Sequence, residues 1–103
     1  MPKSNIEREI EKILEDCEDE EEELSAWEMA FQDNVETPFA ALLLGVSLEV
    51  QDFRLGNAGN IQCQIQAGDI ERWISVEDLD ETNLPDDFDH YLKLYQAWCS
   101  EDY

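Results

Sequence analysis

Basic residues are scarce in this sequence of 103 residues, which has six Lys and Arg against 27 Asp and Glu. The formal net charge at pH 7 is therefore -21. A chain of this charge is repelled by the phosphates of nucleic acids and by anionic lipid surfaces, so we expect neither as a partner. It attracts hard cations, above all Ca²⁺, which selects oxygen ligands, and it attracts basic proteins.

Cysteine and histidine are also few. The three cysteines lie far apart without a Cys-x-x-Cys pair, and His90 is the only histidine. This argues against a zinc site and against a disulfide framework, and it fits a reducing environment. The first residues lack the apolar core of a signal peptide, and the longest apolar run, 39–48, is about half of the ~20 residues that a membrane helix requires. We therefore expect a cytoplasmic protein.

The residues that enzyme chemistry requires are missing as well. Gly56 and Gly59 are not followed by the Lys-Ser/Thr pair of a phosphate-binding loop. No Ser or Cys stands in a recognisable nucleophile context. His90 lies among aromatic residues of a predicted helix, where a structural role is the simpler interpretation. We expect no enzymatic activity.

Apolar residues, by contrast, are plentiful. They make up 43% of the chain and include three Trp, three Tyr and four Phe. A disordered acidic chain would be poor in these residues, so we expect one folded domain over 1–103. Its N-terminal part, 1–32, is predicted to be helical and very acidic. One apolar face begins at Ile6, and a second helix over about 24–32 could be continuous with the first.

The pattern changes from helix to strand after residue 38. Apolar and polar residues alternate over 46–53 and 61–67, and a third strand is predicted over 72–76. Gly45 is interpreted as a bulge or bend. The segment 38–76 therefore predicts an antiparallel sheet, and 85–99 predicts a C-terminal helix. The fold class is α+β, with a small antiparallel β-meander or SH3-like partial barrel flanked by N-terminal and C-terminal helices.

Two loops combine acids with polar residues, as a Ca²⁺ site requires. An EF-hand is excluded, because 78–89 lacks its glycine and its spacing. In a three-strand meander the 33–37 loop lies beside Asp69, and the 77–81 loop lies at the opposite end of the sheet. If the bent first strand closes a barrel, the two loops instead approach each other. The candidate ligands are Asp33, Asn34 and Glu36 in the first set, and Glu77, Asp78, Asp80 and Glu81, joined by Asp52, in the second. The alternative, that both are ordinary solvated loops, stays open.

The densest acidic stretch, 15–23, is acidic at eight of nine positions. Neighbouring carboxylates on a helix or coil splay outward, so we expect weak condensation of cations here and no metal cage. Such a block is also typical of an acidic interaction module that docks on a basic protein or imitates a nucleic acid.

The segments 39–53, FAALLLGVSLEVQDF, and 71–80, ERWISVEDLD, resemble the cyanobacterial calcium-binding protein family, and the likeness extends over about 24–99. Its members are small, acidic, cytoplasmic proteins that bind Ca²⁺ without EF-hands. The resemblance implies a Ca²⁺ buffer or sensor in calcium signalling, linked in that family to heterocyst differentiation. No short motif transfers a ligand set, so the ligands named above depend on the topology argument. The competing hypothesis is the acidic interaction module.

Overall fold

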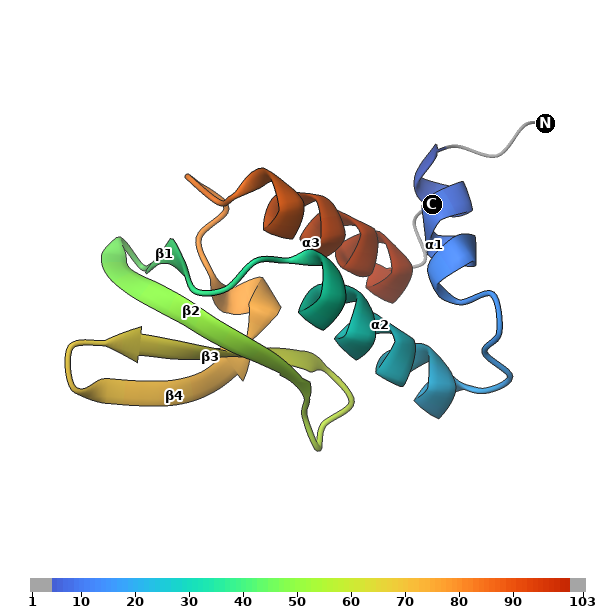
Figure 1. Cartoon of the computed structure of the whole chain (residues 1–103), viewed down its shortest axis with the longest axis horizontal. Helices are drawn as coiled ribbons and strands as arrows, with labels where there is room; N and C mark the ends of the chain where they lie inside the picture. The colour runs from blue at the N-terminus through green and yellow to red at the C-terminus, as the bar shows by residue number, and fades with distance from the viewer. Residues whose placement is uncertain (1–4, 101–103) are drawn as a thin grey trace.

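The structure is a computed structural model that describes residues 5–100 and confirms the α+β class. The described chain forms three α-helices, one short 3-10 helix and a four-stranded antiparallel sheet (Figure 1). The elements are, in order, α1 (Asn5–Ile13), α2 (Glu20–Asn34), β1 (Phe39–Leu43), β2 (Val46–Leu55), β3 (Ile61–Ala67), β4 (Ile70–Ser75), η1 (Val76–Asp78) and α3 (Asp86–Ser100).

The sheet has the order β1-β2-β3-β4 and so contains one strand more than the three that the sequence predicted. Gly45 is neither a bulge nor a bend within one strand. Leu43 pairs with Val46, and Leu44 and Gly45 form a two-residue turn between β1 and β2. Both turn residues have positive φ, 50° and 78°, as the tight turns that match the twist of a hairpin require. Leucine is a rare residue in such a turn, and this is why the hairpin was missed.

The sheet is partly closed on itself. The backbone N–H of Asp80, which follows β4 and η1, donates to the carbonyl oxygen of Leu42 in β1 (2.8 Å). This bond ties the segment after the last strand to the first strand, as a partial barrel requires.

The two N-terminal helices are separate, and the acidic block 15–23 lies partly in the connection between them and partly in the first turn of α2. α1 ends at Ile13, and α2 begins after Asp19, whose carboxylate accepts from the backbone N–H of Glu22 (2.9 Å). The Glu22 carboxylate accepts from the N–H of Glu18, the residue before the cap (2.8 Å). These two bonds fix the start of α2. The acids 20–23 form its first turn, where the helix dipole favours negative charge.

The core lies between the sheet and the pair α2 and α3, which run side by side on one face of it (Figure 1). Phe31 of α2 contacts Phe53 of β2 and Phe88 of α3, with ring centroids 5.2 Å and 6.0 Å away. α1 packs across the outer end of the two helices through Ile10, which is 1% exposed. None of the helices described over residues 5–100 has the length and apolar character needed to cross a membrane.

Candidate functional site

The first candidate set lies where α2 passes into β1. The side chains of Asp33, Asn34 and Glu36 are exposed. The amide of Asn34 donates to the carbonyl oxygen of Ala30 (2.9 Å), and the backbone N–H of Glu36 donates to a carboxylate oxygen of Asp87 (3.1 Å). The structure thus adds Asp87, from the first turn of α3, to this set. Sequence reasoning placed Asp87 only at a helix start, because nothing local links it to a loop 51 positions earlier.

The expected meeting of this loop with Asp69 does not occur. β1 pairs with β2 from Phe39 to Leu43, so the chain advances four residues, roughly 14 Å at strand geometry, before it reaches the sheet end that holds the β3–β4 turn. That prediction was wrong because it depended on a three-strand meander. The hydrogen bonds described for residues 5–100 do not link the 33–37 loop to the 77–81 segment either. Glu36 bonds to Asp87 instead.

In the second set, Asp80 has a fixed position. Its two carboxylate oxygens accept separately from the backbone N–H groups of Leu44 (3.0 Å) and Gly45 (2.9 Å). The side chain is half-buried, and together with the backbone bond to Leu42 it holds the β1–β2 turn against the segment after β4. Asp80 is therefore an ordered carboxylate.

The other acids of the second set face different neighbours. Burial raises the pKa of Cys63 to about 12, and the nearby charge of Asp78 adds to this. Burial also raises the pKa of Cys99, and the charge of Glu77 adds to that shift. A hydrogen bond to Asp89 raises the pKa of Lys93, and the charge of Glu81 contributes further. Glu77, Asp78 and Glu81 thus spread over the surface between the sheet and α3.

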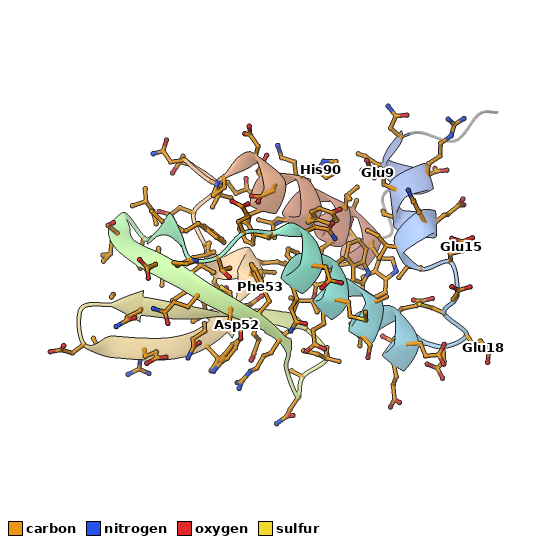
Figure 2. The ribbon with its side chains drawn as sticks, viewed as in Figure 1. Glu9, Glu15, Glu18, Asp52, Phe53 and His90 are labelled. Atoms are coloured by element: carbon orange, nitrogen blue, oxygen red, sulfur yellow. The ribbon has the colours of Figure 1, made fainter. Side chains whose placement is uncertain are left out.

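Asp52 stands apart from the rest of this set. It follows the register shift between β2 and β3, pairs with Gln64, and accepts from the backbone N–H of Phe53 through its own carboxylate (2.8 Å). Its exposed side chain lies on the sheet face opposite the buried Phe53, and Figure 2 labels both residues.

Four carboxylates of the acidic block line one surface hollow, although they do not converge in the arrangement of a metal site. Glu18, Asp19, Glu20 and Glu23 share a surface hollow of about 600 Å³. The rest of its wall is formed by Leu24 of α2, Gly59 of the β2–β3 turn, and Trp98 and Cys99 of α3. Figure 2 labels Glu18 at the loop that leads into α2. Sequence reasoning could not find this hollow, because its walls come from three distant segments.

These residues fit a hard cation in donor chemistry, since carboxylate and carbonyl oxygens are the ligands that Ca²⁺ prefers. They do not form a finished cage: within residues 5–100, no three acidic, histidine or cysteine side chains converge in the arrangement of a metal site. A cation bound here would have to draw exposed carboxylates together. Side chains as exposed as Asp33, Glu36 and Asp78 have the freedom to rotate.

No protein-family model and no curated protein sequence matches this chain. Two solved structures match it at 19% identity and a TM-score of 0.80. One is a calcium binding protein in its calcium-binding form, and the match covers 98% of this chain and 94% of that one. The other is the crystal structure of CcbP from Anabaena, with coverage of 97% and 93%. At this identity the likeness establishes a shared fold over nearly the whole of each chain.

Proposed function

We propose that this protein binds Ca²⁺ reversibly and acts as a cytoplasmic buffer or sensor in calcium signalling. The observation that supports this most is the match, over 98% of the chain, to a protein solved in its calcium-binding form. The net charge of -21 supports it independently, because the field of the whole chain raises the local concentration of cations. Both solved neighbours have the overall fold found here, so any shared function would use the same scaffold.

In this proposal the ligands come from the two sets named above. The first is the α2–β1 loop with Asp33, Asn34 and Glu36, extended by Asp87, which already touches that loop. The second is the segment after β4, with Asp80 as its ordered member. The remaining members of the second set are Glu77, Asp78, Glu81 and Asp52. Ca²⁺ takes six to eight oxygens, so each site also needs backbone carbonyls or water.

Titration calorimetry with Ca²⁺ at near-physiological salt and millimolar Mg²⁺ tests the proposal. We expect saturable binding of defined stoichiometry. Asp33→Ala or Asp78→Ala is expected to weaken the tighter site about tenfold or more, because each removes a charged ligand. Asp69→Ala is the matched control, since Asp69 is an exposed turn carboxylate outside both sets.

Two results would count against the proposal at different levels. Weak, unsaturable heat that fades as salt is added would mean counterion condensation without a site. If neither variant changes tight binding, the protein does bind Ca²⁺, but the ligands assigned here are wrong.

A second candidate function, docking on a basic protein, is favoured by the acidic hollow beside α2. Deletion of 15–23 would not test it cleanly, because Asp19 and Glu22 cap the helix. Neutralising only Glu15, Asp16, Glu18, Glu20 and Glu21 as amides leaves that cap in place. If this function is correct, the changed protein loses affinity for an oligolysine peptide and keeps its tighter Ca²⁺ site.

A further inference from the structure

Large apolar side chains are exposed at one end of the sheet. Leu44 is 88% exposed, Val46 is 59% exposed and Ile70 is 58% exposed. Single exposed apolar residues are ordinary on protein surfaces, but a group of three at one place points to an interaction. We call Leu44, Val46 and Ile70 the hairpin-end patch. It differs from Met29, which is also 58% exposed but lies on α2.

Strand register places the patch at one end. Glu49 pairs with Gln66, so the start of β2 at Val46 extends to the β3–β4 turn, and Ile70 pairs with Ala67 beside that turn. Because side chains alternate along a strand, Val46 lies on the same face as the buried Leu48, which is the core face.

The helices do not reach this part of the core face. In Figure 1 the β1–β2 and β3–β4 turns extend to the left, beyond the ends of α2 and α3. Val46 and Ile70 are therefore inward-facing residues without a covering layer, which explains their exposure.

Leu44 has an unfavourable position for a residue that serves folding alone. Its φ of 50° is in the left-handed region, where a leucine side chain is disfavoured and asparagine or glycine is common. Its side chain gains little burial in return. The two carboxylate oxygens of Asp80 nevertheless hold the turn in place. Backbone strain that the surrounding structure holds in place is typical of binding sites. Here it lies at an exposed apolar residue.

We propose that the hairpin-end patch docks a basic amphipathic helix of a partner protein. A helix is the expected occupant because α2 and α3 already cover the rest of this sheet face. A basic partner is expected because two acids adjoin the patch, Asp69 beside Ile70 and Asp80 against Leu44, whereas one basic residue, Arg72, shares the core face with Ile70. An apolar centre with a charged rim is the usual anatomy of an interface. A second copy would bring another charge of -21 and be repelled. The inference does not depend on Ca²⁺ binding.

A helical peptide of Leu and Lys with one apolar face is a suitable probe, titrated by fluorescence anisotropy at near-physiological salt. We expect saturable binding that Leu44→Asn and Ile70→Thr each weaken about tenfold, since each removes the burial of a large apolar side chain. Met29→Gln removes an equally exposed apolar side chain elsewhere and should leave the affinity unchanged. Leu44→Asn should also raise the melting temperature of the free protein, because asparagine is favoured in this turn. Weaker binding by that variant could then not be attributed to unfolding.

Three results would overturn the proposal. Peptide affinity that neither Leu44→Asn nor Ile70→Thr changes would mean that charge alone attracts the peptide. An equal loss in the Met29→Gln variant would mean that the peptide binds exposed apolar side chains in general and not this patch. A dimer of the free protein in sedimentation equilibrium that Leu44→Asn abolishes would assign the patch to a second copy of the chain.

Discussion

At the residue scale, Asp80 illustrates how one carboxylate acquires a role from its surroundings. In the sequence it is one acid among several in a turn-prone loop. In the structure its oxygens accept from two successive backbone N–H groups of the β1–β2 turn. Charge-assisted bonds of this kind are stronger than neutral ones, and here they connect the first hairpin to the segment after the last strand. A Ca²⁺ ion bound by Asp80 would therefore lie next to the hairpin-end patch.

The buried thiol Cys63 predicts sensitivity to alkaline pH. Burial raises its pKa from 9.0 to about 12, and burial raises the pKa of Tyr95 from 10.0 to about 12. The unfolded chain therefore loses these protons at lower pH than the folded one. The stability is complete below about pH 9 and is expected to fall as the pH rises from 9 towards 12. The melting temperature against pH should show this fall.

The variant Cys63→Ala isolates the contribution of the thiol. It removes one titrating group, so its melting temperature should decline less steeply over the same range of pH, although its stability at neutral pH is lower. Val50→Ala trims a buried side chain that does not titrate, and it serves as the control for the loss of stability alone. Parallel pH curves for the parent and Cys63→Ala would contradict the interpretation.

At the element scale, α2 completes the edge of a strand. β1 pairs with β2 only up to Val50, so the edge of β2 beyond that point lacks a neighbouring strand. Gln32 donates through its side chain to the carbonyl oxygen of Phe53 (2.9 Å), and Glu28 accepts from the N–H of Leu55 (2.6 Å). The two side chains are four positions apart and so share one face of the helix. They replace the missing strand.

Glu28→Ala is therefore expected to leave the N–H of Leu55 without its partner. We expect a loss of about 1–2 kcal/mol in the free energy of unfolding, because the bond is charge-assisted but only partly buried. Hydrogen exchange at the Leu55 amide should become faster than at other β2 amides. Ser25→Ala, an exposed position on the same helix, is the control. Unchanged exchange at Leu55 would mean that water or a neighbouring group satisfies this amide.

At the scale of the whole molecule, charge repulsion opposes the compact state. The 27 acids face six basic residues, and the ion pairs near α3, such as Lys93 with Asp89 (2.9 Å), lie at the surface, where each contributes little. The protein is therefore stabilised by whatever lowers repulsion among its carboxylates. This gives cations a direct effect on folding that requires no finished cage.

We expect the melting temperature to rise with NaCl through screening, and to rise further with CaCl₂ at the same ionic strength, because a specific ligand stabilises only the native state that binds it. A concentration of Ca²⁺ 100 times the dissociation constant corresponds to about 2.7 kcal/mol. MgCl₂ at equal concentration is the control for divalent charge. If Ca²⁺ and Mg²⁺ raise the melting temperature equally, stabilisation comes from divalent charge and not from a Ca²⁺ site.

Much of the fold could be predicted from periodicity. Alternation identified the strands that became β2 and β3, and the aromatic face of 85–99 identified α3. These signals are local, because a half-buried strand or helix must repeat its apolar residues with the period of its own geometry. The β1–β2 hairpin was missed because its turn has Leu44 where the common turn residues were expected. The start of α2 was placed late, since a run of acids conceals a capping aspartate.

The sequence by itself determined the strong negative charge, the α+β class and the chemistry that this surface offers to cations and basic partners. Those properties follow from composition and from local periodicity. Only the tertiary structure decided what these carboxylates contact. Asp87 accepts from the backbone N–H of Glu36, and Asp80 accepts from that of Leu44. Glu18, Asp19, Glu20 and Glu23 line one hollow. Such contacts join residues far apart in the chain. Their positions depend on strand number and register, and a single additional strand was enough to move the 33–37 loop away from Asp69.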